Sequence, residues 1–398
     1  MTFQVQTPNG GSDFLGFQNF SGTNIAKITA ADASANALTI TTGNSGTTAA
    51  MFDTNQNATM NYISAQNTFG FKNRIINGAM VIDQRNAGAS VSTSSGVSIY
   101  SVDRWKLVYT QTSKFTAQQN AGSVTPPVGF VNYLGITSSS AYTPVAADYF
   151  QITQAIEGLN IADLGWGTVN AKTVTFSFWA YSSLTGTFGG CLNNANGNYN
   201  YPFTYTISSA NTWTQISVTI VGPTAGSWNT NNNGGIYVNF NLAFGSTYTG
   251  TANAWNSGSA QNPTGAINIL STSGATFYIT GVQLEKGSIA TPFDYRDYGR
   301  ELAMCQRYYE QDAWSAIGAN TNGTNINWPM FYKVSKRTTP TVTVSGTVTF
   351  QGVVGGVTQG TASGNNNWVV GSATRSGTAG AAYYVTSDTG GWYSSAEL

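Results

Sequence analysis

The sequence predicts a mainly β protein, and three observations lead to this fold class. Apolar and polar residues alternate with period two in many short segments, as they do in strands that bury one face. Clusters of Gly, Asn, Ser and Pro separate these segments, and 45 of the 398 residues are Gly. Only one stretch, near residue 300, has the apolar spacing of a helix. This length allows two or more folding units.

Residues 1–70 form the first predicted unit, and they are rich in Thr, Ala, Asn, Ser and Gly. The alternation in ALTIT, residues 37–41, predicts brief strands. Small sheets with so few apolar residues bury too little surface to be stable alone. We therefore expect a thin stem or anchor that depends on partner chains.

Residues 71–296 predict a two-sheet jelly-roll β-sandwich. The run 236–244 alternates most regularly and places Ile236, Val238, Phe240, Leu242 and Phe244 on one face. The runs 174–181 and 216–220 alternate in the same way. Two apolar pairs follow each other in the run 277–284: Phe277 and Ile279 are at odd positions, and Val282 and Leu284 are at even positions. If both pairs face the core, we expect a bulge near Thr280–Gly281. Many short antiparallel strands joined by such loops favour a jelly roll.

Residues 297–398 predict one short helix followed by a small all-β C-terminal tip domain. Asp294 is the expected N-cap of the helix. Its apolar stripe runs through Tyr298, Leu302, Cys305 and Tyr308 or Tyr309. Beyond the helix, TVTVSGTVTFQGVV and AAYYVTSD alternate again, which predicts further strands.

The charge balance and the apolar profile exclude several partners. Sixteen basic and sixteen acidic residues cancel, so we expect no nucleic-acid partner and no attraction to anionic membranes. No apolar run is long enough to span a membrane, and no secretory signal is present at the N-terminus. We expect no membrane insertion and synthesis in the cytoplasm.

The residue types available for chemistry are few. Histidine is absent, which removes the commonest general base and metal ligand. Cys191 and Cys305 are far apart in sequence and are expected to be free, buried thiols. We expect no cofactor and no metal; bound calcium stays open, although no dense acidic loop favours it.

Acidic residues are missing from most of the predicted sandwich. No Lys, Arg, Asp or Glu occurs from Thr173 through Leu284. Glycoside hydrolysis usually needs two carboxylates about 5 to 10 Å apart. The nearest acids are Asp148, Glu157, Asp163 and Glu285, which we interpret as loop or capping residues. A polysaccharide depolymerase is therefore a less favoured alternative.

The same uncharged region is rich in aromatic and amide side chains. Flat rings pack on the C–H face of a sugar, and Asn and Ser supply neutral hydrogen-bonding groups for its hydroxyls. This combination favours binding of a neutral saccharide, while packing within the sandwich is the alternative for any one ring. The candidate glycan contacts are Trp179, Tyr181, Tyr199, Tyr201, Trp213, Trp228 and Trp255.

Two short motifs concentrate charge near the start of the sandwich. NRIINGAMVIDQRNAG, residues 73–88, contains Asp83 and Arg85, and YSVDRWKL, residues 100–107, contains Asp103, Arg104 and Trp105. If two strands carrying these residues lie side by side, the charges form a network that fixes the register of the first strand. A structural role is favoured over a catalytic one.

These motifs also carry a family resemblance. NRIINGAMVIDQRNAG, VDRW and the later FYITGVQLEKGSIATPFDYRDYGRELAMCQRYYE together resemble a paired signature of tail fibre and receptor-binding proteins of tailed bacteriophages and their prophages. PMFYKVSKRTTPTVTVSG and the terminal SSAEL extend the resemblance more loosely. Residues 1–70 and the middle of the sandwich show none of it.

The resemblance implies a virion tail fibre with a carbohydrate-binding-like jelly roll, generally a homotrimer, that attaches to host-surface glycans without catalysis. It also implies that the N-terminal segment anchors the fibre to other tail or baseplate proteins. A structural fibre or decoration protein of the capsid or collar is the main alternative. The motifs mark scaffold, so they assign no catalytic residue.

Overall fold

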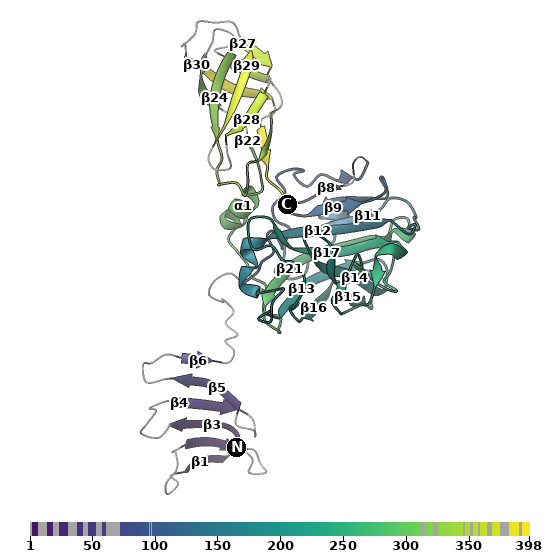
Figure 1. Ribbon diagram of the computed structural model, residues 1–398, viewed down its shortest axis with the longest axis vertical. Helices are drawn as coiled ribbons and strands as arrows, with labels where there is room; N and C mark the ends of the chain where they lie inside the picture. The colour runs from purple at the N-terminus through teal and green to yellow at the C-terminus, as the bar shows by residue number, and fades with distance from the viewer. Residues whose placement is uncertain are drawn as a thin grey trace. The chain divides into compact units, whose positions relative to one another are not determined.

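A computed structural model describes residues 72–94, 96, 98–312, 331–343 and 392–398 with their side chains, and elsewhere only the backbone of strands. The chain divides into two compact units, Met1–Thr68 and Phe69–Leu398. Strands dominate both units (Figure 1), which confirms the predicted mainly β class. The predicted domain divisions at residues 70 and 297 stay predictions.

The first unit contains one antiparallel sheet in which each strand pairs with the next in sequence. The predicted strand at 37–41 corresponds to β4. The expected dependence on partner chains stays a prediction. The strands are β1 (Thr2–Gln6), β2 (Phe14–Gln18), β3 (Asn24–Ala30), β4 (Leu38–Thr42), β5 (Thr47–Phe52) and β6 (Ala58–Met60).

The second unit contains the β-sandwich. One sheet has the strand order β16-β13-β21-β11-β10-β7 and the other β19-β15-β14-β17-β12-β9-β8. The bounds are β7 (Val91–Ser92), β8 (Ser98–Tyr100), β9 (Lys106–Tyr109), β10 (Phe115–Gln119), β11 (Leu134–Ser138), β12 (Tyr149–Glu157), β13 (Val174–Ser182), β14 (Gly186–Asn194), β15 (Tyr199–Ile207), β16 (Thr214–Ile220), β17 (Gly234–Phe244), β19 (Asn256–Ser257) and β21 (Thr276–Lys286).

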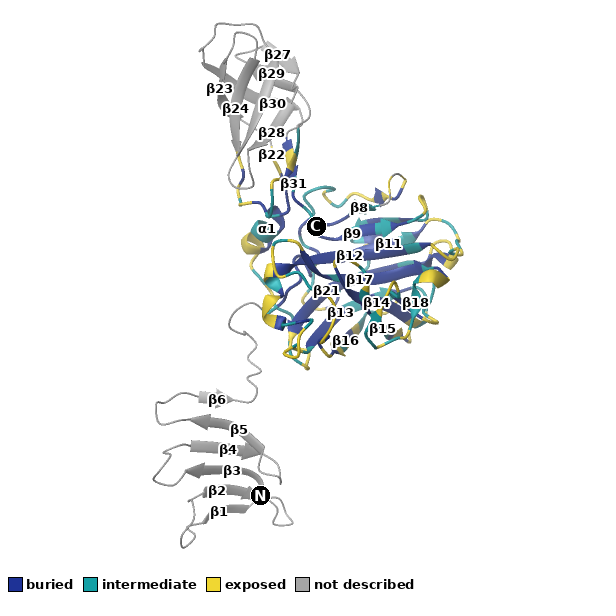
Figure 2. Ribbon diagram, viewed as in Figure 1, coloured by how far each residue is buried: buried dark blue, intermediate teal, exposed yellow. Residues whose placement is uncertain are grey.

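Apolar side chains from both sheets form the core between them (Figure 2). The predicted inward residues Ile236, Val238, Phe240 and Leu242 of β17 are fully buried, whereas Phe244 at the strand end is half-buried. Phe240 contacts the ring of Phe178 at a centroid distance of 4.9 Å. Each such side chain contributes about 1.5 to 3 kcal/mol by its burial. The alternating pattern thus predicted the buried face correctly.

The predicted bulge occurs in β21. Ser177 of β13 pairs with Gln283 and Trp179 pairs with Thr280, so Gly281 and Val282 both lie opposite Phe178. Gly281 has a φ of +61°, a conformation that side chains disfavour. The extra residue changes the parity, and all four predicted inward residues of this strand, Phe277, Ile279, Val282 and Leu284, are buried.

The predicted helix is α1 (Tyr298–Gln306), but its N-cap is Asp297 and not Asp294. The Asp297 carboxylate accepts a hydrogen bond from the Arg300 amide at 2.9 Å. Asp294 instead accepts one from the Asn73 amide at 3.3 Å, which ties the chain down before the helix begins. Tyr298, predicted to belong to the apolar stripe, is 63% exposed, so the prediction is wrong for this residue, whereas Cys305 and Tyr308 are buried. Both cysteines are free and buried, as predicted.

Strands follow the helix, which confirms the predicted β content of the C-terminal part. A three-stranded sheet has the order β22-β31-β25, and a seven-stranded sheet has the order β27-β26-β30-β23-β24-β29-β28. Within the described residues, no helix has the length and apolar character needed to cross a membrane. The bounds are β22 (Tyr309–Asp312), β23 (Ser315–Asn320), β24 (Asn325–Phe331), β25 (Thr341–Val344), β26 (Thr347–Phe350), β27 (Val353–Gly356), β28 (Gln359–Ser363), β29 (Trp368–Thr374), β30 (Ala382–Thr389) and β31 (Trp392–Ser395).

Candidate functional site

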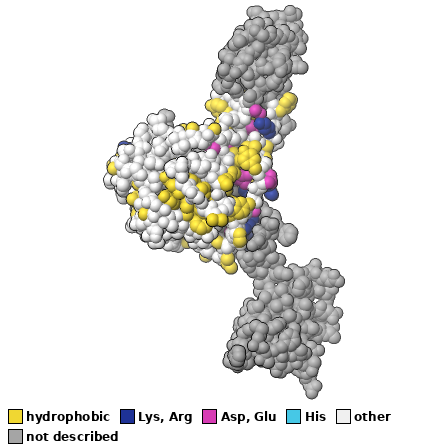
Figure 3. Space-filling model, turned by 180° about the vertical axis from the view of Figure 1, so that it is seen from behind, with side chains coloured by type: hydrophobic (Ala, Val, Ile, Leu, Met, Phe, Trp, Pro, Cys, Tyr) yellow, Lys and Arg dark blue, Asp and Glu magenta, His cyan; other side chains and the backbone are white. Residues whose placement is uncertain are grey.

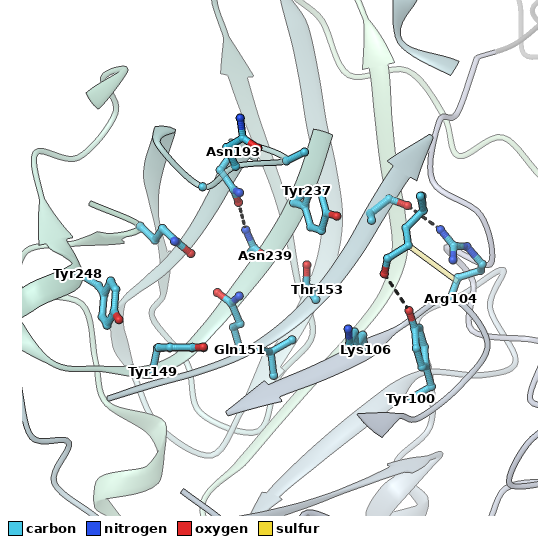
Figure 4. A pocket seen from close by; sticks show the side chains of 17 residues that line it. Tyr100, Arg104, Lys106, Tyr149, Gln151, Thr153, Asn193, Tyr237, Asn239 and Tyr248 are labelled. Carbon is cyan, nitrogen blue, oxygen red and sulfur yellow. Dashed lines mark hydrogen bonds between the residues drawn. The ribbon is translucent and has the colours of Figure 1, made fainter. Parts of the chain in front are cut away.

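A groove lies on the outer face of the seven-stranded sandwich sheet (Figure 4). Successive side chains of a strand point to opposite faces, so β12 sends Ile152 and Ile156 into the core and Gln151 and Thr153 into the groove. The groove has a volume of about 480 Å³. Small-molecule sites typically measure about 300 to 1,000 Å³, so the groove has the size of a ligand site.

Strand register aligns the polar floor of the groove. Thr153 of β12 lies opposite Asn239 of β17 on one side and Lys106 of β9 on the other. Lys106 in turn lies opposite Tyr100 of β8. The floor therefore contains a continuous polar row across four strands, from Asn239 to Tyr100.

Tyrosine rings stand at both ends of the groove. Tyr149 and Tyr248 are at one end, where their rings meet edge to face at a centroid distance of 5.3 Å. Tyr100 is at the other end, and its hydroxyl donates to the Leu398 carbonyl at 3.3 Å. Tyr237 of β17 lines the groove beside Asn193 of β14, its register partner. These rings supply flat apolar surfaces around the polar floor.

Three polar atoms of the groove lack a hydrogen-bond partner among the described residues. They are Gln151 Oε1, Thr153 Oγ1 and Asn239 Oδ1. The side chains are buried, with 8%, 5% and 1% of their surface exposed. The Asn239 Nδ2 donates to Asn193 Oδ1 at 2.5 Å, which leaves the Oδ1 atom as the free acceptor. A buried polar group without a partner costs about 1 to 3 kcal/mol, so a ligand toward which these side chains turn would recover that cost.

The charged lining of the groove is basic. Arg104 and Lys106 line it, and none of the described lining residues is Asp or Glu. Arg104 is ion-paired with Glu397, and its Nη2 donates to the Ala155 carbonyl at 2.6 Å. The groove therefore presents no pair of carboxylates for glycoside hydrolysis.

The four acids closest in sequence to the uncharged region lie outside the groove lining, and each has a hydrogen-bond or ion-pair partner there. Asp148 accepts hydrogen bonds from Thr110 and Tyr142, and Glu157 is ion-paired with Arg307 at 2.6 Å. Asp163 is ion-paired with Arg74 and Lys286, and Glu285 accepts from the Thr291 hydroxyl. The loop or capping interpretation is wrong for Glu157 and Glu285, which are buried residues of β12 and β21. Their partners explain how these two carboxylates are accommodated there.

The seven candidate rings from the sequence lie outside the groove lining. Tyr199, Tyr201, Trp228 and Trp255 form a cluster that includes Trp166. Tyr181 and Trp213 form a second cluster with Tyr133 and Tyr278. Trp179 lines a smaller cavity of about 210 Å³.

Tyr201 is buried and the other six rings are half-buried. The indole N–H groups of Trp213, Trp228 and Trp255 donate to backbone carbonyls, so these polar groups already have partners within the protein. Their role as glycan contacts stays a prediction.

The groove residues were not singled out from the sequence. The alternation in 236–244 placed Tyr237 and Asn239 on the polar face of a strand, which was the available signal. Tyr100, Lys106 and Gln151 precede the uncharged run, so a search restricted to that run missed them.

Arg85, Asp103 and Arg104 of the expected charge network lie around Glu397, a residue that the sequence did not single out, whereas Asp83 lies outside this network. Arg85 lies 3.5 Å from the Asp103 carboxylate and 2.9 Å from that of Glu397. Arg104 pairs with Glu397 from the other side, and its guanidinium lies 3.5 Å from the centroid of the Tyr308 ring. Burial raises the pKa of Asp103 to about 6. The network joins the sandwich to the residues after α1.

The predicted strand pairing within this network is wrong. Residues 84–88 form turns and not a strand. Asn77 and Met80 have left-handed φ values of 57° and 58°, which interrupt an extended course. Asp83 accepts hydrogen bonds from the Asn86 and Gly88 amides at 3.0 and 2.7 Å and so stabilises its own turn.

Trp105 of the second motif stabilises the same region by packing and by a hydrogen bond. Its Nε1 donates to the Asn77 carbonyl at 3.0 Å, and its ring is fully buried in the sandwich core. Across the described part of the chain, no group of three or more His, Cys, Asp or Glu could hold a metal ion.

Comparison with known proteins gives only distant similarity. No protein-family model and no curated protein matches the chain. The chain is similar to the enzymatically active domain of tailspike protein 4 from bacteriophage CBA120, with 16% identity over 46% of this chain and 19% of that chain and a TM-score of 0.28. A family 11 carbohydrate-binding module from Clostridium thermocellum matches with 13% identity over 51% of this chain and 97% of that chain, at a TM-score of 0.26.

The N-terminal cellulose-binding domain of Cellulomonas fimi β-1,4-glucanase C matches with 11% identity over 52% of this chain and 99% of that chain, at a TM-score of 0.22. All three TM-scores lie below 0.5, so these similarities carry no inference about what this chain binds.

Proposed function

We propose that the outer groove of the sandwich binds a saccharide and that the protein is a non-enzymatic attachment fibre of a tailed-phage virion. The observation that carries the binding proposal is the set of three buried, unpartnered polar atoms on the groove floor, Gln151 Oε1, Thr153 Oγ1 and Asn239 Oδ1. Two of these atoms are amide carbonyl oxygens that accept hydrogen bonds, and the third belongs to a hydroxyl that donates or accepts.

Sugar hydroxyls match this floor because each of them can donate one hydrogen bond and accept others. The tyrosines around the floor, such as Tyr237 and Tyr149, offer ring faces for the C–H surface of a pyranose. The lining lacks Asp and Glu among its described residues, which favours binding without hydrolysis.

The assignment to a virion tail fibre rests on the resemblance of the charged motifs. These motifs build the network of Arg85, Arg104 and Glu397, which is a structural element that borders the groove through Arg104. In this proposal the fibre is a homotrimer, its N-terminal unit attaches to tail or baseplate proteins, and its groove meets host polysaccharide. Several weak sites on one particle exceed the affinity of a single site by about 100-fold or more.

The test compares Thr153→Val with the wild-type protein for binding to purified host-surface polysaccharides. Valine keeps the shape of threonine and removes a buried hydroxyl that has no partner within the described residues, so the variant should be as stable as the wild type, or more stable by up to about 3 kcal/mol. Saccharide affinity should fall about tenfold, which is the effect of one lost hydrogen bond.

The matched control is Thr206→Val, at an exposed position of β15 outside the groove lining, and it should bind like the wild type. Equal binding by Thr153→Val and the wild type would remove the groove as the site. A wild-type trimer that binds neither host cells nor their polysaccharides would favour the alternative of a purely structural fibre.

A further inference from the structure

The groove contains a cation with no anionic partner. Lys106 projects from β9 into the middle of the polar row, between Thr153 and Tyr100 (Figure 4). Among the described residues, no Asp or Glu forms an ion pair with its Nζ atom. Its contact with the Tyr100 ring is long, at 5.8 Å from Nζ to the ring centroid, which is near the outer limit for a cation–π interaction.

Arg104, the other basic residue of the lining, differs in this respect. Its charge is balanced by Glu397, and its guanidinium also donates to the Ala155 carbonyl and covers the Tyr308 ring. Among the described side chains of the groove lining, the charge without an ion-pair partner therefore belongs to Lys106.

We infer that the saccharide is acidic and that its anionic group binds Lys106; this inference rests on the proposed function. The ligand must offer hydroxyl groups to Gln151, Thr153 and Asn239 and a strong acceptor to Lys106. A hydroxylated ring that carries a carboxylate or a phosphate has both properties. A charge-assisted hydrogen bond is about twice as strong as a neutral one, so Lys106 selects between acidic and neutral sugars of the same shape.

This ligand class differs from the neutral saccharide that the sequence predicts. The prediction came from the run Thr173–Leu284, which contains no charged residue. The groove extends beyond the strands of that run, because β12 pairs with β17 on one side and with β9 on the other. Strand pairing thus brings Lys106 beside the uncharged surface.

The experiment measures binding of the full-length protein to immobilised bacterial polysaccharides. Each member that contains uronic acid is accompanied by its carboxyl-reduced, neutral form, and phosphorylated members are included. The variants are Lys106→Met, which keeps the length of the side chain and removes its charge, and Lys172→Met. Lys172 is exposed and outside the groove lining, so it serves as the control.

We expect the wild type to bind an acidic member at least about tenfold more tightly than the uncharged counterpart. Lys106→Met should abolish that preference by weakening the binding of acidic members, and Lys172→Met should behave as the wild type. Selective binding of uronic acid members assigns a carboxylate, and selective binding of phosphorylated members assigns a phosphate. Raising the salt concentration should weaken the acidic preference.

Two other results are distinguishable. If carboxyl reduction and Lys106→Met both leave affinity unchanged while saccharides still bind, the acidic ligand is wrong and the proposed function stands. If the wild type binds no member at all, the proposed function itself is contradicted.

Discussion

Glu397 holds two arginines in place at the junction between the sandwich and the end of the chain. The side chain of Glu397 is 8% exposed, and the side chains of its partners Arg85 and Arg104 are 13% and 2% exposed. Taking charges out of water is costly, so a buried pair stabilises only while both members are present. The terminal motif SSAEL is therefore part of the same structural element as the early motif that contains Arg85.

Replacement of this carboxylate tests its role. Glu397→Gln should lower the free energy of unfolding by about 3 kcal/mol, because it leaves two buried guanidinium groups with less compensation. Urea denaturation measures the change. The control is Asp312→Asn, which removes an exposed ion pair with Lys333 and should cost less than about 1 kcal/mol. Equal effects of the two substitutions would contradict a stabilising network.

The pH dependence of stability tests the environment of Asp103. Burial raises the pKa of Asp103 to about 6 in the folded state, against 3.8 for the ordinary carboxyl. Between these values the folded protein keeps a proton that the unfolded chain has released. This contribution is complete below about pH 4 and is lost as the pH rises toward 6.

We expect the stability of the wild type, relative to that of Asp103→Asn, to fall by roughly 2 to 3 kcal/mol between pH 4 and pH 6.5. Urea denaturation at several pH values measures this difference, in which the effects of the other carboxylates cancel. A flat difference would show that Asp103 is ionised throughout.

At the scale of elements, the bulge in β21 depends on Gly281. A Cβ atom there would lie 2.6 Å from Phe130 Cζ and 3.0 Å from Trp179 Cδ1. The positive φ adds a conformational cost for any other residue. This one position allows both halves of β21 to direct apolar residues into the core.

Gly281→Ala should therefore destabilise the protein by about 2 to 4 kcal/mol, from the φ cost and the clash together. Gly274→Ala measures the cost of the positive φ alone, because Gly274 has a φ of +76° and open space where a Cβ would lie. We expect this variant to lose about 1 kcal/mol of stability. Chemical denaturation of both variants gives the comparison. A smaller loss for Gly281→Ala than for Gly274→Ala would be inconsistent with the crowding.

The elements differ in how well the sequence predicts them. β17 was predicted because one face is buried and the other polar, and this alternation is visible in the residues themselves. The start of α1 was misplaced because Asp294 and Asp297 both precede the helix, and a contact with Asn73, far away in sequence, decides between them. Local pattern identifies an element, whereas its end depends on tertiary partners.

At the scale of the molecule, the candidate site was less predictable than the fold. The groove combines side chains from β8, β9, β12, β14 and β17, whose pairing is not encoded in any local pattern. The charge distribution was easier to anticipate, since the uncharged run predicts a neutral sandwich surface. From behind, most visible charged side chains indeed gather along one side of the described part (Figure 3).

The division into two units leads to a prediction about avidity. The fragment Phe69–Leu398 forms a compact unit of its own and contains the whole groove. It should bind a soluble oligosaccharide as tightly as the full-length protein does. If residues 1–68 assemble the trimer, the fragment should bind a polysaccharide-coated surface about 100-fold more weakly. Titration with the soluble oligosaccharide and binding to the coated surface measure the two affinities. Light scattering measures the oligomeric state of the fragment, and a trimeric fragment would place assembly in the second unit.

The two buried thiols can report on local unfolding of the elements that contain them. Cys191 belongs to β14 in the sandwich and Cys305 to α1, and burial raises the pKa of both thiols. Alkylation requires an accessible thiolate, so the intact protein should resist a maleimide at neutral pH. Mass spectrometry of the alkylated sites under mild denaturant would then show whether the helix detaches before the sheets separate.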